Sequence, residues 1–276
     1  IEFRLGFSLV CRSVISAMSK LSNLSRSIEG KVVFITGAGS GMGRATAKLF
    51  AEYGAKVAVS DLNKDSAAET VEQILQADCA AKAWELDVTD ADAIKNTIEE
   101  AAAHYSGLDV LINNAGISLR TPIDNDDYEE RFAKSVSVLL TSHTRTIRAA
   151  LPFLRKSESP RIINIASTEG LGAIPGNSPY TSSKHGVIGL TRSLATELGK
   201  EGITVNAICP GPILTGMTDW IPEEDREIYS RRRIALRRYG DPEEVAQLSL
   251  SLALPAASYI TGTAIPVDGG LTIRRG

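Results

Sequence analysis

Short runs of aliphatic and β-branched residues recur along the chain from about residue 31 onward. A strand of a half-exposed sheet alternates apolar with polar residues. These runs are instead apolar at most consecutive positions, so they predict strands that are buried on both faces. The runs occupy residues 32–35, 57–59, 110–112, 162–165 and 205–208.

Longer segments with apolar residues at helical spacing separate these runs. They span about residues 43–53, 64–76, 90–105, 128–154, 180–198 and 242–252. Sustained strand–helix alternation is typical of an α/β protein with a parallel sheet and helices on both faces. We therefore expect a single Rossmann-like domain with a doubly wound sheet, whose ligands bind at the carboxyl ends of the strands.

Two segments depart from this rhythm. Residues 1–28 are rich in Ser and Arg, with Glu2 as the only acid. This composition is typical of an organellar transit peptide, and it also fits an expression remnant followed by a flexible tail. We favour the second interpretation and expect an N-terminal extension at 1–29, a domain at 30–276, and unchanged folding when 1–17 are deleted. The charged, weakly patterned segment 211–239 is a candidate substrate lid.

Composition and charge exclude several classes of protein. The 276 residues are 43% hydrophobic, which is enough for a packed core and argues against disorder. Thirty basic residues against 33 acidic ones give a net charge of −3, so nothing favours binding to nucleic acid or to an anionic membrane. The three cysteines and three histidines lack metal-ligand spacing. We expect no metal and a cytoplasmic location.

A glycine-rich turn follows the first predicted strand and leads directly into a helix. It reads Thr36-Gly37-Ala38-Gly39-Ser40-Gly41-Met42-Gly43. Glycines at such a turn let the backbone approach a pyrophosphate, whose charge the helix N-terminus stabilises. Many tight turns also need glycine, so the context of a buried strand and an amphipathic helix carries the prediction of a dinucleotide site.

Asp61 ends the second predicted strand, where an acid can accept hydrogen bonds from an adenosine ribose. The same carboxylate would repel a 2′-phosphate, and no basic residue stands at Asp61, Leu62 or Asn63 to bind one. The alternative role of Asp61 is a helix N-cap, which Asn63 or Asp65 can supply equally well. We predict NAD as the cofactor in preference to NADP.

Three polar residues follow the fifth predicted strand in an ordered set. Ser167 ends that strand, and Tyr180 and Lys184 are spaced so that they share one helix face. A phenol with a pKa of about 10 is a poor acid or base at neutral pH. A neighbouring ammonium, together with the positive nicotinamide of an oxidised cofactor, favours the phenolate. Each residue alone has an ordinary structural role. Together they predict an acid/base site in which Ser167 holds the substrate oxygen.

From about residue 30 to 270 the chain resembles a classical short-chain dehydrogenase/reductase. The similarity rests on motifs that occur in the family's order: the glycine-rich turn, Asp87-Val88, Asn113-Asn114-Ala115-Gly116, Ser167, Tyr180 with Lys184, Pro210-Gly211-Pro212-Ile213-Leu214-Thr215 and Asp268-Gly269-Gly270.

The resemblance implies a role for each matching residue. Ser167 would polarise the substrate oxygen, Tyr180 would be the acid/base, and Lys184 would bind the nicotinamide ribose. The implied cofactor contacts are Gly37, Ser40, Gly41, Met42, Gly43, Asp61, Leu62, Asp87, Val88, Asn114, Ala115, Gly116, Tyr180, Lys184, Pro210, Gly211, Ile213 and Thr215. The resemblance also implies a homodimer or homotetramer formed through the helices at 128–154 and 180–198.

The chain departs from the family at one position. The family usually carries an asparagine in the long helix before the fifth strand, where it relays protons to the lysine through a water molecule. Leu139 stands at this position and cannot hydrogen-bond through its side chain. Ser135 and His143 lie one helical turn to either side, so we expect a polar substitute on that face.

The sequence therefore supports three hypotheses. The first is an NAD-dependent oxidoreductase that transfers a hydride between nicotinamide and a secondary alcohol or ketone. The second is a dinucleotide-binding sensor or scaffold whose catalysis has lapsed with the change to Leu139. The third is an NADP-dependent ketone reductase. The substrate is a small molecule whose identity depends on the loop at 169–177 and on the lid.

Overall fold

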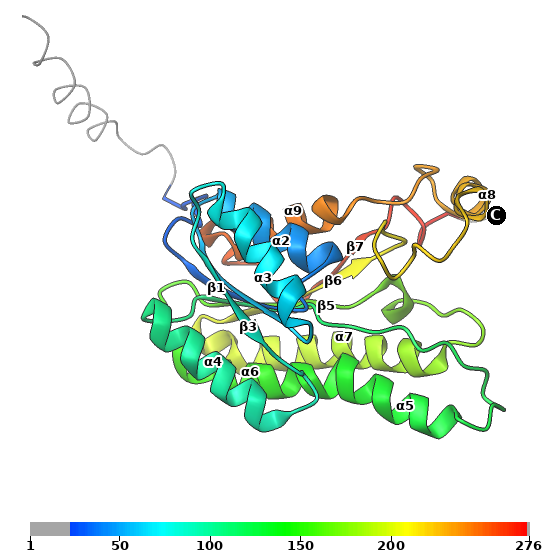
Figure 1. The fold of residues 1–276 in the computed structure, drawn as a ribbon, viewed down its shortest axis with the longest axis horizontal. Helices are drawn as coiled ribbons and strands as arrows, with labels where there is room; N and C mark the ends of the chain where they lie inside the picture. The colour runs from blue at the N-terminus through cyan, green and yellow to red at the C-terminus, as the bar shows by residue number, and fades with distance from the viewer. Residues whose placement is uncertain (1–22, 275–276) are drawn as a thin grey trace, which may run out of the picture.

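The computed structural model describes residues 23–274, and the predictions for residues 1–17 lie outside this range. Seven strands form one parallel sheet in the order β3-β2-β1-β4-β5-β6-β7 (Figure 1). The strands are β1 (Val32–Thr36), β2 (Lys56–Asp61), β3 (Ala81–Glu85), β4 (Val110–Asn113), β5 (Arg161–Ile165), β6 (Thr204–Pro210) and β7 (Ala264–Val267). The predicted doubly wound α/β fold is confirmed.

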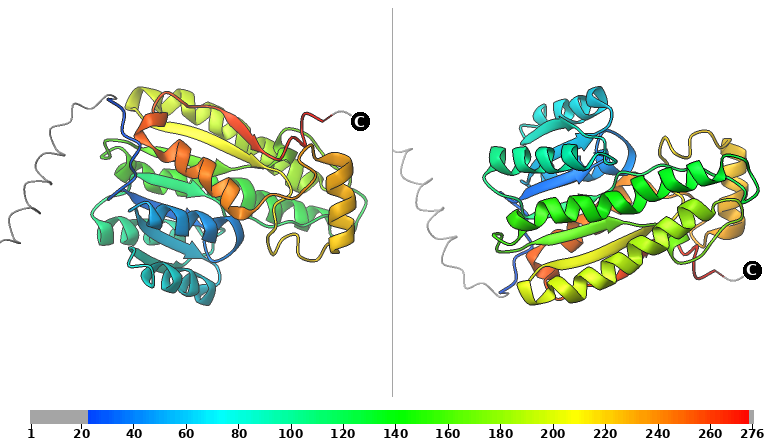
Figure 2. Two further views of the ribbon diagram at one scale, coloured as in Figure 1. Left: turned by 90° about the horizontal axis from the view of Figure 1, so that it is seen from above. Right: turned by 90° about the horizontal axis from the view of Figure 1, so that it is seen from below.

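Helices cover both faces of the sheet, as the two views of Figure 2 show. One face carries α2 (Gly41–Glu52), α3 (Lys64–Leu75) and α9 (Pro242–Ala253). The other carries α4 (Ala91–Tyr105), α5 (Tyr128–Val136), α6 (Ser142–Leu154) and α7 (Ser178–Leu198). The remaining long helix, α8 (Glu223–Arg233), lies beyond the carboxyl edge of the sheet.

The central strand explains why the apolar runs are continuous. In β1, Val33 and Ile35 belong to the core under α2 and α9, whereas Val32 and Phe34 belong to the core under α4 and α6. Successive side chains of a strand point to opposite faces, so a strand that is covered on both sides needs apolar residues at every position. Every residue of β1 is accordingly buried.

The strand order reverses at β1, whose neighbours are β2 on one side and β4 on the other. Loops leaving β1 and β4 at their carboxyl ends turn to opposite faces, which opens a crevice between them. The sequence motifs predicted to bind a cofactor all follow strands at this edge, so the fold brings together residues that are far apart along the chain.

Two details differ from the sequence-based expectations. Ile28, within the extension expected to stay outside the fold, is only 1% exposed and belongs to the core under α2. The segment 211–239, expected to be weakly patterned, contains the highly polar helix α8. None of the helices among the described residues is long and apolar enough to cross a bilayer.

Candidate active site

The glycine-rich turn connects β1 to α2 and requires glycine for steric reasons. Gly37 has a φ of 64°, and a Cβ at this position would lie 2.7 Å from the Cα of Ala115. A Cβ on Gly43 would lie 2.1 Å from the carbonyl oxygen of Gly37, so the first turn of α2 packs directly against the loop. At these glycines no side chain covers the backbone of the helix N-terminus, so a pyrophosphate of a dinucleotide can approach its N–H groups.

Asn114, at the end of β4, fastens this turn to the neighbouring strand. Its Nδ2 donates to the carbonyl oxygens of Thr36 and Gly37, both at 2.9 Å. The hydroxyl of Thr36 accepts the backbone N–H groups of Asn114 and Ala115 at 3.0 Å. Sequence reasoning gave Thr36 no role of its own, although its place between strand and first glycine was visible. The two residues join the carboxyl ends of β1 and β4.

Asp61 lies against the glycine-rich turn rather than capping α3. Its Oδ2 accepts the backbone N–H of Gly39 at 2.8 Å, and its Oδ1 accepts that of Asn63 at 2.9 Å. The cap of α3 is Asn63, whose side chain accepts the N–H of Ser66. The alternative interpretation of Asp61 as an N-cap is therefore wrong, and its carboxylate is fixed beside the loop.

Arg44 is a cation close to the same loop that the sequence analysis did not weigh. Its guanidinium donates to the carbonyl oxygen of Gly39. It also forms a bidentate salt bridge with Glu69, in which Nη1 lies 2.8 Å from Oε1 and Nη2 lies 2.7 Å from Oε2. Because this pairing neutralises Arg44, the charge beside Gly39 is set by Asp61.

The remaining residues expected to contact a cofactor also lie at the carboxyl edge. Asp87 and Val88 follow β3. The Oδ1 of Asp87 accepts the backbone N–H and the hydroxyl of Thr89, both at 2.8 Å. After β6, Ile213 is buried, and Thr215 lies close to Gly41, since a Cβ on that glycine would be 3.1 Å from its Cγ2. Leu62 is 67% exposed and points away from the core.

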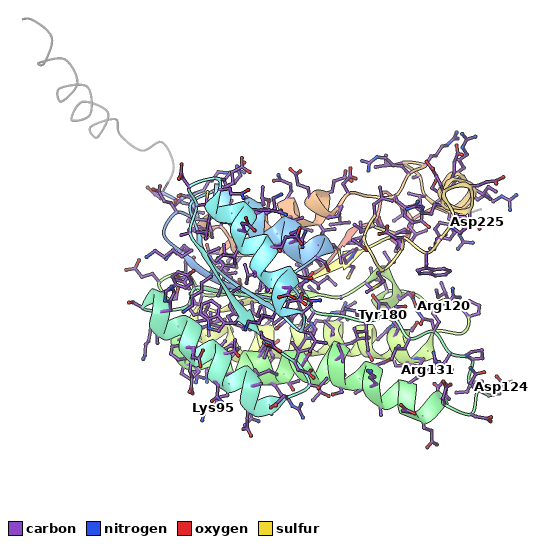
Figure 3. All side chains as sticks on the ribbon, viewed as in Figure 1. Lys95, Arg120, Asp124, Arg131, Tyr180 and Asp225 are labelled. Carbon is purple, nitrogen blue, oxygen red and sulfur yellow. The ribbon has the colours of Figure 1, made fainter. Side chains whose placement is uncertain are left out.

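Ser167, Tyr180 and Lys184 converge at the end of β5 and the start of α7. Ser167 is buried, and its hydroxyl accepts the backbone N–H of Glu169 at 3.1 Å and acts to lower the pKa of the Tyr180 phenol. The Nζ of Lys184 donates to the carbonyl oxygen of Ile165 at 2.7 Å and lies 5.5 Å from the centre of the Tyr180 ring. Figure 3 labels Tyr180 at the same end of the molecule as Asp225 of α8.

Burial dominates the proton affinities of this group. It raises the pKa of Tyr180 to about 12, and the Ser167 hydrogen bond only partly opposes it. Burial also lowers the pKa of Lys184 to about 8. In the chain alone the phenol therefore holds its proton at neutral pH. The expectation that Lys184 and a positive nicotinamide together favour the phenolate stays a prediction.

Leu139 occupies an irregular turn within the long segment predicted as one helix. A π-helical stretch, Ser137–Thr141, separates α5 from α6, and Leu139 is fully buried there. Polar atoms do lie nearby, as expected. The Ser135 hydroxyl and the Nε2 of His143 are buried and have no hydrogen-bond partner among the described residues. Burial and the charge of Lys184 lower the pKa of His143 to about 3, so its imidazole is neutral.

Comparisons with known proteins agree with this geometry. Residues 37–272 match the family model described as "Enoyl-(Acyl carrier protein) reductase". The chain is 41% identical over 246 residues to the 3-oxoacyl-[acyl-carrier-protein] reductase FabG of Thermotoga maritima, covering 89% of this chain and 99% of that one. It is 36% identical over 248 residues to a meso-2,3-butanediol dehydrogenase of Serratia marcescens, covering 90% and 97%.

A solved structure gives the same result for the fold. A dehydrogenase/reductase from Sinorhizobium meliloti 1021 superposes with a TM-score of 0.84 at 37% identity, covering 90% of this chain and 97% of that one. The similarity therefore extends over the sheet, both helix layers and the crevice, and is not confined to the glycine-rich turn.

Proposed function

Because this chain belongs to the short-chain dehydrogenase/reductase family, we propose that it is an NAD-dependent oxidoreductase of secondary alcohols and their ketones. The observation that carries this proposal is the convergence of Ser167, Tyr180 and Lys184 beside a crevice that fits a dinucleotide. Members of the family bind a nicotinamide cofactor, and the finer assignment to NAD rests on Asp61.

Gly37, Gly41 and Gly43 would hold the pyrophosphate, Asp61 the adenosine ribose, and Lys184 the nicotinamide ribose. When bound, the cofactor supplies the acceptor or donor of the hydride, and in its oxidised form it also carries a positive charge. A glycine-lined backbone with a carboxylate at its mouth fits these groups. The chain's own residues must then bind the substrate oxygen and move its proton.

Ser167 and Tyr180 would share the substrate oxygen, because the Ser167 hydroxyl already acts on the pKa of the Tyr180 phenol. In reduction, the Tyr180 phenol donates its proton to the carbonyl oxygen as it becomes an alcohol. In oxidation, the phenolate accepts the hydroxyl proton. Lys184 keeps its ammonium fixed on the Ile165 carbonyl and so stabilises the phenolate in either direction.

The direct test follows cofactor absorbance with the purified protein. NAD is offered with a panel of secondary alcohols, and NADH with the matching ketones. Turnover on any member supports the enzyme assignment. Binding of NAD without turnover on a broad panel would instead favour a sensor or scaffold, the candidate function suggested by Leu139 at the position of the usual asparagine.

A second candidate function is NADP-dependent ketone reduction, which the names of the 3-oxoacyl-[acyl-carrier-protein] reductase relatives favour. It differs from the first in cofactor and direction, so measuring kcat/KM with both cofactors separates the two. We also propose that the chain forms a homodimer or homotetramer through the outer faces of α5, α6 and α7. Light scattering, which measures the molar mass of the assembly, tests this proposal.

Replacing Asp61 with Ser is expected to shift the cofactor preference toward NADP. The change removes a carboxylate that repels a 2′-phosphate and that accepts two backbone N–H groups. Hydrogen bonds to charged groups commonly contribute about 1.5–3 kcal/mol, so the ratio of kcat/KM for NADP over NAD should rise by roughly 10–100-fold. Asp65→Ser, an exposed neighbour with the same charge change, is the control. A wild type that already prefers NADP contradicts the assignment.

A further inference from the structure

A carboxylate lies next to Ser167 and to the start of α7. Glu169 is in the short 3-10 turn Thr168–Gly170, and its backbone N–H donates to the hydroxyl of Ser167 at 3.1 Å. Its Oε2 accepts the hydroxyl of Thr181 at 2.7 Å, and Thr181 directly follows Tyr180. Glu169 therefore connects the loop that carries Ser167 with the helix that carries Tyr180.

Both oxygens of the same carboxylate accept from one amide nitrogen. The Nδ2 of Asn177 lies 3.0 Å from each Glu169 oxygen. This contact fixes the orientation of the amide, because a flipped amide would turn its oxygen toward the carboxylate. The Oδ1 of Asn177 then points elsewhere, and it is buried without a hydrogen-bond partner among the described residues.

No cation compensates the charge of Glu169. Its hydrogen-bond partners are neutral, and it forms no salt bridge within residues 23–274. A carboxylate offers about four lone-pair sites, of which three are used, and the free one is on Oε1. A partly buried anion with spare acceptor capacity favours an additional hydrogen-bond donor.

The position of Glu169 relative to the tyrosines indicates where that donor would come from. Its charge adds to the burial that raises the pKa of Tyr180, and it has the same effect on Tyr229 of α8. The geometry agrees with this, because the backbone N–H of Glu169 donates to the Ser167 hydroxyl and its carboxylate accepts from Thr181, the residue after Tyr180. The partly exposed Glu169 is therefore a neighbour of the two residues that would hold the substrate oxygen.

We propose that Glu169 binds a second hydroxyl of the substrate, next to the reacting carbon, and that it rejects substrates with an acid group there. The preferred substrates are then vicinal diols and, in the reverse direction, α-hydroxy ketones. This inference rests on the proposed oxidoreductase function and adds the substrate class. The unpartnered Oδ1 of Asn177 supplies a second buried acceptor close to the same carboxylate.

A purely structural role for Glu169 would give a different result. If the carboxylate only joined the loop to α7, its replacement would lower the rates for all alcohols by the same factor. A recognition role instead changes the ratios between substrates. Three small probes of similar size separate these effects: 2,3-butanediol with a neighbouring hydroxyl, 2-butanol with none, and lactate with a neighbouring carboxylate.

The experiment measures kcat/KM for the three probes with NAD. Wild type is expected to prefer 2,3-butanediol over 2-butanol by at least about tenfold, and 2-butanol over lactate by a similar factor. In Glu169→Gln, which keeps the size and the acceptor for Thr181, the diol preference should fall and lactate should gain about tenfold relative to 2-butanol. Removal of the negative charge should also lower the pKa of Tyr180, so the acidic limb of the pH–rate profile for oxidation should shift to lower pH.

Two controls accompany this variant. Glu99→Gln makes the same charge change on the exposed surface of α4 and should leave both ratios unchanged. Glu169→Asp retains the charge on a shorter side chain, so it should lose diol preference while still rejecting lactate. It can also test the inference by itself if Glu169→Gln does not fold.

Turnover of 2-butanol without any preference for the diol would overturn the inference and leave the proposed function standing. Unchanged ratios in Glu169→Gln would do the same. A wild type that binds NAD but oxidises none of a broad panel would overturn the proposed function, and with it the inference.

Discussion

Tyr180→Phe is expected to abolish turnover while leaving NAD affinity nearly unchanged. The substitution removes one hydroxyl, the group that exchanges a proton with the substrate oxygen, and keeps the ring that packs near Lys184. Loss of a positioned acid/base commonly costs roughly 10²–10⁴-fold in rate. The measurement is kcat on a confirmed substrate, together with NAD binding by calorimetry or fluorescence.

Tyr105→Phe is a matched control for this prediction. Tyr105 is also partly buried, and burial raises its pKa to about 12 as well, but its hydroxyl contacts the carbonyl oxygen of Val57, remote from Ser167. This variant should keep its rate within a small factor of wild type. If Tyr180→Phe retained near-normal turnover, Tyr180 would not be the acid/base.

Gly43→Ala is expected to weaken both the fold and cofactor binding. The added methyl carbon would lie 2.1 Å from the Gly37 carbonyl oxygen and 2.5 Å from the Nδ2 of Asn114, so α2 must move away from β1. Overpacking of this kind commonly costs about 1–3 kcal/mol of stability. Because the moved backbone is the part that binds the pyrophosphate, NAD affinity should fall by at least about tenfold.

The control for this substitution is another helical glycine. Gly199 begins the 3-10 turn Gly199–Glu201 after α7, is exposed, and a Cβ there meets no atom within 4 Å. Gly199→Ala should therefore raise the melting temperature slightly, because alanine favours helical backbone by about 0.5–1 kcal/mol over glycine. Equal effects of the two substitutions on NAD affinity would mean that the turn at Gly43 has no special role in binding.

The strands at the centre of the sheet could be predicted because burial on both faces leaves continuous apolar runs. The two edge strands lack this pattern. In β3 the buried Trp84 is flanked by partly or fully exposed residues, and β7 contains Pro266. Helix α8 was not predicted, because its charged residues give no apolar face at helical spacing.

For the candidate site, sequence reasoning identified the catalytic and glycine motifs but not the contacts between them. Nothing in the spacing of Thr36 and Asn114 indicates that they bind each other across β1 and β4. The π-helical turn at Leu139 and the burial that sets the pKa of Tyr180 also depend on packing between distant segments. Such effects follow only from the folded structure.

The position of β1 at the middle of a parallel sheet has a consequence for how the chain acquires its structure. β1 pairs with β2 nearby in sequence, but its other edge pairs with β4, which is made only after α3, β3 and α4. No hairpin can bring parallel strands together, so this pairing must close a long loop before it gains any contacts. We expect folding dominated by non-local contacts, slower than in a helical bundle of this length. During synthesis on the ribosome, β1 emerges before β4, so one edge of this apolar strand stays unpaired until β4 has been made. An unpaired apolar strand edge exposes the nascent chain to aggregation.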